Sequence, residues 1–127
     1  MHTIRFNGSQ MVAQLEQLSD EKLDALHFGV IGFDKDLKVR RYNDVERRYS
    51  GLSLPSVIGR HVFEMVAPCL NNIMVAGQYL DAAAANEPLD HVMEHVLTLR
   101  MRLTPARLRL LRQPEIAMWY LLIERQV

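Results

Sequence analysis

The order of strand-like and helix-like segments is the feature that most constrains the fold of this chain. The run 28–34, Phe-Gly-Val-Ile-Gly-Phe-Asp, is typical of a buried strand, and a polar turn at 34–36 leads into a second strand at 37–42. Short helical turns come next, and they are followed by a helix at 73–86 and by strands at 91–102, 106–110 and 116–123. This order predicts an α+β fold in which helices pack on one face of a five-stranded antiparallel sheet.

Two short helices are expected before the first strand. Ser9 precedes an amphipathic segment at 10–18, and Ser19 is suited to cap a second segment with acidic residues in its first turn. Both segments are weakly apolar and lie near a terminus, so we expect a helical cap that packs on the domain and opens more easily than the rest.

Composition and charge limit the classes of protein to consider. The 127 residues are 49% hydrophobic, which fits one domain over 1–127, divided into an N-terminal cap at 1–27 and a core at 28–127. The formal net charge of +0 provides no field that attracts nucleic acid or an anionic membrane, so we expect neither as a partner. No apolar run approaches the roughly 18 residues of a spanning helix, and the first residues lack the hydrophobic stretch of a signal peptide. We therefore expect a cytoplasmic protein.

Three polar side chains stand at a four-residue spacing in the middle of the chain. A helix that begins near Asn43 brings the phenol of Tyr42, the carboxyl of Glu46 and the hydroxyl of Ser50 close to one side of one element. The only cysteine, Cys69, follows between apolar residues and cannot form an internal disulfide. A single thiol together with these hydrogen-bonding groups indicates a covalently attached, phenol-bearing ligand.

Each of these residues also has a purely structural interpretation. Asn43 and Glu46 have the spacing of a capping box, which the residues alone favour, whereas in an apolar pocket the pKa of Glu46 would be raised and the neutral acid would donate its proton. An inert core thiol is the commoner role for a free cysteine such as Cys69. A thioester requires the thiolate, and His61 reads as a surface residue rather than as the base of a catalytic pair.

Two further patterns are weaker. His91 and His95 lie on one strand face, where they could bind a metal with Cys69, but the spacing is not a ligand pattern and we expect no metal. Arginines recur at alternate positions of two adjacent strands, which favours a solvated sheet face over a partner-binding stripe; they are Arg100, Arg102, Arg107, Arg109 and Arg112.

The chain resembles the photoactive yellow protein family, small blue-light receptors of the PAS class. The resemblance covers nearly the whole chain, from 26–29 to the final Trp-Tyr strand, and rests on Tyr42, Asn43, Glu46, Ser50-Gly51, Val57-Ile58-Gly59, Phe63, Val66-Ala67-Pro68-Cys69 and Leu103-Thr104-Pro105. It implies a PAS fold and a para-hydroxycinnamoyl (para-coumaric acid) chromophore attached to Cys69 as a thioester. Tyr42 and a protonated Glu46 would hydrogen-bond the phenolate, with Ser50 behind them. Light would isomerise the double bond, Glu46 would pass its proton to the phenolate, and the cap would loosen.

Three positions depart from the family pattern. Leu52 stands where the family commonly has an arginine, Val62 where it has a phenylalanine, and Leu103 where it has a methionine. We expect these residues to line a more aliphatic pocket.

The resemblance implies a sensor rather than an enzyme, acting on an unknown downstream signalling protein as a monomer or weak homodimer. The alternatives are a chromophore-free PAS module for interaction or dimerisation and, less favoured, a cysteine enzyme that uses Cys69 and His61.

Overall fold

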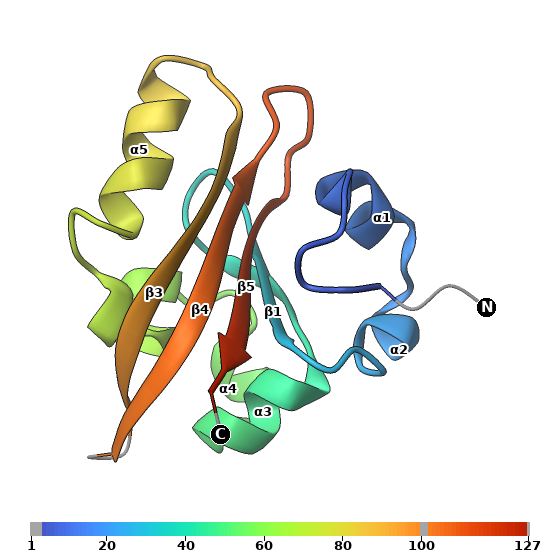
Figure 1. Cartoon of the computed structure of the whole chain (residues 1–127), viewed down its shortest axis with the longest axis vertical. Coiled ribbons are helices and arrows are strands. Elements are labelled where there is room, and N and C mark those ends of the chain that lie inside the picture. The colour runs from blue at the N-terminus through green and yellow to red at the C-terminus, as the bar shows by residue number, and fades with distance from the viewer. Residues whose placement is uncertain (1–3, 100–101, 127) are drawn as a thin grey trace.

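The computed structural model describes residues 4–99 and 102–126, which form one antiparallel sheet in the strand order β2-β1-β5-β4-β3 (Figure 1). The strands are β1 (Gly29–Phe33), β2 (Val39–Tyr42), β3 (Leu89–Leu99), β4 (Arg102–Arg112) and β5 (Trp119–Arg125). The helices are α1 (Met11–Gln17), α2 (Asp20–Leu23), α3 (Asp44–Ser50), α4 (Leu54–Val57), the π-helical turn η1 (Val62–Val66), the 3-10 turn η2 (Pro68–Leu70) and α5 (Ala76–Ala84). The five-stranded antiparallel sheet expected from the sequence is confirmed.

Each face of the sheet carries its own hydrophobic cluster. The site-side core joins the sheet to α4, η1, η2 and α5, and the cap core joins the opposite face to α1 and α2 (Figure 1). Strand β5 alternates between the two: Leu121 and Ile123 belong to the site-side core, while Tyr120 and Leu122 belong to the cap core. The N-terminal helices thus cover the face that α5 leaves open.

Arg41 ties the end of α1 to the sheet. Its guanidinium donates to the backbone carbonyls of Leu15 (2.9 Å) and Leu18 (2.7 Å) and to the Tyr120 hydroxyl (2.8 Å). A salt bridge to Asp20 of α2 at 3.0 Å completes the set. The last carbonyl groups of a helix lack partners within the helix, and Arg41 supplies donors for two of them at the end of α1.

Arg109 holds the segment before α1 in the same way. It donates to the carbonyls of Phe6 (2.9 Å) and Gly8 (2.8 Å) and forms a two-pronged pair with Asp90 at 2.8 Å on each arm. The expectation of a solvated arginine face was therefore wrong for Arg109, which lies beneath the cap, and for Arg112, which is buried over the Trp119 ring on the other face. The alternation in the sequence assigns each arginine to one face of the sheet, but it does not show that other elements cover both faces. Arg102 is exposed, Arg107 is half-buried, and Arg100 lies outside the described residues.

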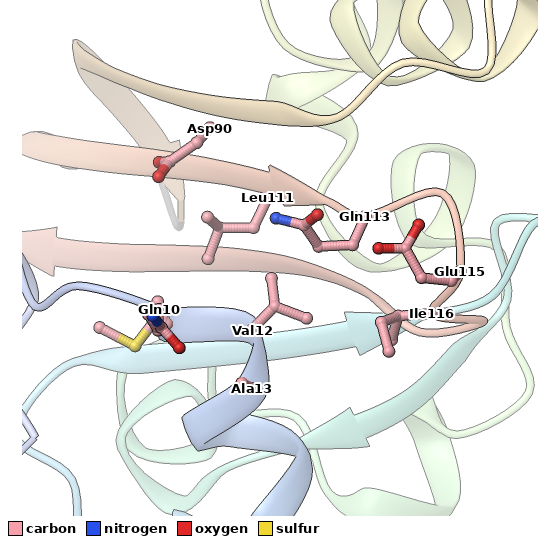
Figure 2. Close-up of a pocket in the computed structure, with 9 residues that line it drawn as sticks. Gln10, Val12, Ala13, Asp90, Leu111, Gln113, Glu115 and Ile116 are labelled. Carbon is pink, nitrogen blue, oxygen red and sulfur yellow. The ribbon is translucent and has the colours of Figure 1, made fainter.

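The cap does not fill the whole of its face. A cavity of about 350 Å³ separates the start of α1 from the β4–β5 connection (Figure 2). Its lining consists of Gln10, Met11, Val12, Ala13, Asp90, Leu111, Gln113, Glu115 and Ile116. At this pocket α1 gains less packing stabilisation than a filled interface would give.

Candidate functional site

Tyr42 and Ser50 meet across the start and end of α3. Tyr42 ends β2, Asn43 caps α3 by accepting from the Glu46 N–H, and Gly51 ends the helix at a φ of 75° that favours glycine. The buried Tyr42 hydroxyl donates to Ser50 Oγ at 2.8 Å. Burial, and then the nearby negative charge of Glu46, raises the pKa of Tyr42 to about 12.

Glu46 forms a buried ion pair with Arg125, the next-to-last described residue of the chain. Arg125 Nη1 donates to Oε1 at 2.5 Å and Nη2 donates to Oε2 at 3.2 Å, and the two side chains are only 4% and 3% exposed. The guanidinium also lies 4.5 Å from the centre of the Tyr49 ring. Two guanidinium N–H groups that donate to the two oxygens of one carboxyl group form a bidentate, charge-assisted contact.

This arrangement bears on both sequence interpretations of Glu46. The surroundings of its carboxyl group include Arg125, which the sequence did not predict, and its role as a proton donor stays a prediction. The capping box is half right: the side chain of Asn43 caps the helix, but its own N–H donates to Val30 O at 3.1 Å rather than to Glu46. One signal was available, since Arg125 follows Ile123 at the strand spacing and therefore shares its face.

Gly29 of β1 makes room for the Glu46 carboxyl. A Cβ atom at this position would lie 1.9 Å from Glu46 Oε1, so any other residue would displace the carboxyl group. The glycine thereby fixes where the ion pair can sit against the sheet.

Cys69 lies on η2, partly exposed, and packs against the same site-side core that contains Tyr42. His61 is not directed to it as a base: the His61 ring Nδ1 accepts the backbone N–H groups of Phe63 (3.2 Å) and Glu64 (3.1 Å) and so caps η1. This contact gives His61 a structural role that the sequence did not reveal.

The three departing positions do not come together. Val62 is fully buried in the site-side core and Leu52 packs partly buried against it, but Leu103 is 75% exposed. The β3–β4 ladder pairs Leu103 with Thr98 without interruption, which places it on the face of Arg107 and Arg109, opposite the site-side core. The prediction that Leu103 lines the pocket was therefore wrong. The β3–β4 hairpin is longer than the sequence predicted, and its register turns Leu103 to the opposite face.

Comparison with known proteins identifies the family. A family model described as the PAS fold matches residues 23–120. The photoactive yellow protein of Halochromatium salexigens is 32% identical over 110 residues, which cover 87% of this chain and 87% of that protein. This chain belongs to the photoactive yellow protein family.

Two further relatives agree with this assignment. The photoactive yellow protein of Rhodothalassium salexigens is 28% identical over 112 residues, covering 88% of this chain and 89% of that one. The photoactive yellow protein domain of the sensor histidine kinase Ppr from Rhodospirillum centenum superposes with a TM-score of 0.80 at 27% identity, covering 88% of this chain and 97% of that domain.

Membership of the photoactive yellow protein family confirms the PAS fold and supports a photosensory role. The relatives imply a covalently bound chromophore, and this chain has one cysteine. In residues 4–99 and 102–126, no three His, Cys, Asp or Glu side chains gather as metal ligands. Over the same described residues, no helix is both long and apolar enough to cross a bilayer.

Proposed function

We propose that this member of the photoactive yellow protein family is a blue-light receptor that carries a para-hydroxycinnamoyl group as a thioester on Cys69. The observation that carries the proposal is that Tyr42, Glu46 and Ser50 gather at one end of the site-side core, against which Cys69 also packs. The bound group supplies a conjugated double bond that light can isomerise.

The residues present fit such a group. A partly exposed thiol can be reached by an activated acyl donor, and as the thiolate it attacks the acyl carbon while the donor's leaving group departs. At the other end, the Tyr42 hydroxyl can turn from Ser50 Oγ to a phenolic oxygen, and Ser50 can then donate to Tyr42. Glu46 is the group that can exchange a proton with that oxygen.

The output we propose is a loosening of the N-terminal cap, and Asn43 is the residue that connects it to the site. Its side chain accepts from the Glu46 N–H (3.4 Å) and from the Val30 N–H (2.9 Å). On its other side, Nδ2 donates to Leu23 O of α2 (3.1 Å) and to Phe28 O (2.9 Å). A shift of α3 that followed a change of charge at Glu46 would therefore strain a contact of the cap.

A second connection runs along the surface of α3. Asp24, just after α2, accepts from the Asp44 N–H at 2.8 Å and pairs with Arg47 at 3.2 Å. The Arg47 guanidinium also donates to Tyr42 O at 2.9 Å. Movement of α3 would thus change the contacts of the cap at Leu23 and at Asp24.

Reconstitution tests the proposal. Apoprotein is mixed with an activated ester of para-hydroxycinnamic acid, and the intact mass and absorption spectrum are recorded for wild type and for Cys69→Ala. We expect a single adduct in wild type alone, and faster hydrogen exchange in residues 4–23 under illumination. If Cys69→Ala forms as much adduct as wild type, attachment at this thiol is contradicted. If the hydrogen-exchange rates in residues 4–23 are the same in light and darkness, release of the cap is contradicted.

A chromophore-free PAS interaction module is the second candidate. It is favoured by apolar side chains exposed together on β3 and β4: Val92 (45%), Val96 (49%) and Leu103 (75%). Protein purified from its native host distinguishes the two candidates. An unmodified mass with light-independent dimerisation supports the module, whereas a hydroxycinnamoyl adduct supports the receptor.

A further inference from the structure

A second cavity, of about 270 Å³, lies between α2 of the cap and α4, beside the edge strand β2. Residues from α2, β2, α3 and the α4 region line it, and Figure 1 shows α2 and α3 next to each other at that end of the molecule. The volume equals that of about nine water molecules in the liquid, so it suits a small organic molecule rather than a single ion. Cys69, Glu46 and Ser50 do not line this cavity, which meets the proposed chromophore site only at Tyr42.

Three arginines and two aspartates supply the charged part of the lining. Two of the arginines are held by the aspartates of the cap: Arg41 pairs with Asp20 at 3.0 Å, and Arg47 pairs with Asp24 at 3.2 Å. Each of these pairs offsets its own charge, so Arg40 is the charged side chain of the lining that remains for a ligand.

Arg40 keeps the end of its guanidinium group available. Its Nε donates at 2.8 Å to Asp34, which does not line the cavity and is held in its own turn by the N–H groups of Asp36 and Lys38. Within the described part of the chain, the two terminal nitrogens of Arg40 have no hydrogen-bond partner, and the side chain is 49% exposed. Two parallel N–H groups on a planar guanidinium match the two oxygens of a carboxylate.

Apolar side chains complete the lining. Leu54 begins α4 and Ile58 follows it, and they are 39% and 40% exposed although both are large and apolar. Leu23 contributes to the lining from α2 and is buried. An apolar ligand body placed among these side chains would remove their exposed surface from water, which is favourable.

The two kinds of lining define the ligand. A carboxylate matches a single free guanidinium end, whereas a doubly charged phosphate would also face the carboxyl groups of Asp20 and Asp24. A short branched aliphatic chain suits the apolar surface of Leu54 and Ile58.

We propose that this cavity binds a small carboxylate with a branched aliphatic body, and that the bound molecule holds the cap closed. Such a molecule contacts Leu23 of the cap as well as Arg40 and Ile58, so release of the cap takes away part of its binding surface. A ligand that binds the closed form more tightly than the open form shifts the population toward the closed form. Binding needs no chromophore, and only the signalling value of a held cap rests on the proposed function.

Apoprotein in the dark tests binding by itself. Protein labelled with ¹⁵N is titrated with 4-methylpentanoate at neutral pH; 4-methylpentanamide provides the same shape without the charge, and acetate provides the charge without the body. We expect saturable shifts of backbone amide signals in residues 20–24, 40–42, 47 and 54–58 with 4-methylpentanoate, and binding at least about fivefold weaker for the other two probes. Equal binding of the amide overturns the proposal, as do saturable shifts that centre on residues 62–70 instead.

Matched arginine variants locate the carboxylate. Arg40→Gln removes the free guanidinium end, whereas Arg48→Gln removes an exposed arginine that likewise pairs through Nε with one aspartate, Asp44, at 3.0 Å but does not line the cavity. We expect binding of 4-methylpentanoate to be about fivefold weaker in Arg40→Gln and unchanged in Arg48→Gln. Ile58→Ser tests the apolar lining separately and should weaken binding about threefold. Unchanged affinity in either Arg40→Gln or Ile58→Ser overturns the proposal.

Hydrogen exchange of the same dark apoprotein tests the hold on the cap. At a concentration of 4-methylpentanoate ten times its dissociation constant, we expect exchange in residues 4–23 to be about tenfold slower, with no change in acetate at the same concentration. Unchanged or faster exchange with 4-methylpentanoate overturns the proposal. Neither measurement involves loading of Cys69 or a response to light, so failure of the proposed function leaves these results standing.

Discussion

Replacing Asn43 by alanine should weaken the whole fold more than any other asparagine substitution at a helix start in the described chain. Its side chain is fully buried and makes four hydrogen bonds. Three of these bonds leave α3 and reach Leu23, Phe28 and Val30, so they join α2, the entry to β1 and β1 itself. Alanine removes all four and gives none of the freed backbone groups a new partner.

The expected loss can be built up from the separate contacts. Each freed, buried backbone group costs about 1 kcal/mol or somewhat more, and the loss of the helix cap adds about 1 kcal/mol. The sum for Asn43→Ala is about 3 to 5 kcal/mol, a large part of the roughly 5 to 15 kcal/mol that stabilises a typical domain. For a domain of this size that loss corresponds to a drop of about 10 to 20 °C in Tm.

Urea unfolding followed by circular dichroism measures the free energy directly, and Asn72→Ala is the matched control. Asn72 also caps a turn, accepting from Met74 N–H (2.9 Å) and Val75 N–H (3.0 Å), but it is partly exposed and water can replace its bonds. We expect a loss of about 1 kcal/mol for Asn72→Ala. Equal losses in the two variants, or less than about 1.5 kcal/mol for Asn43→Ala, would refute the reasoning.

Three other substitutions probe separate features. Gly29→Ala should cost about 3 kcal/mol in urea unfolding, because its Cβ would collide with the Glu46 carboxyl at 1.9 Å; an unchanged midpoint would contradict the placement of that carboxyl group. The pKa of Tyr42 is raised to about 12, so the folded state holds this proton more tightly than the unfolded chain does, and the associated stability is complete below pH 10 and is lost as the pH rises through 12. Between pH 9 and pH 12 the free energy of unfolding of Tyr42→Phe should therefore fall by about 2 kcal/mol less than that of wild type. If the free energies of the two proteins fall in parallel over this range, Tyr42 makes no such contribution. Arg109→Met should speed hydrogen exchange in residues 4–18 about tenfold, since it frees two cap carbonyls, whereas Arg107→Met should not; equal exchange in the two variants would remove Arg109 from the contacts that hold the cap.

Local sequence signals were enough to predict the sheet and the part of the site that lies on and beside α3. Alternation and turn residues located the strands, and Asn43 and Gly51 marked the two ends of α3. The spacing of Tyr42 and Ser50 then predicted a contact that the structure places at 2.8 Å. These features depend on neighbours a few residues apart, which is why one sequence suffices to find them. The division into a cap at 1–27 and a core at 28–127 stays a prediction.

Most of the missed features depend on contacts between distant parts of the chain. Arg125 reaches Glu46 only because β5 lies beside β1, and no local pattern states that pairing. The exposure of Leu103 follows from how far the β3–β4 ladder continues, and the burial of Arg109 follows from which face the cap covers. The π-helical turn that carries Val62 is held by the ring of His61, a cap whose sequence signature is weak.

Because two hydrophobic cores share one sheet, release of the N-terminal cap and global unfolding should have different heat-capacity changes. Release of the cap would expose only the apolar side chains between α1, α2 and the outer sheet face, a smaller set than global unfolding exposes. Since the heat-capacity change scales with the apolar surface exposed, the free energy of cap release should curve less with temperature than the free energy of unfolding. The enthalpy of cap release would then vary less with temperature than the enthalpy of unfolding does.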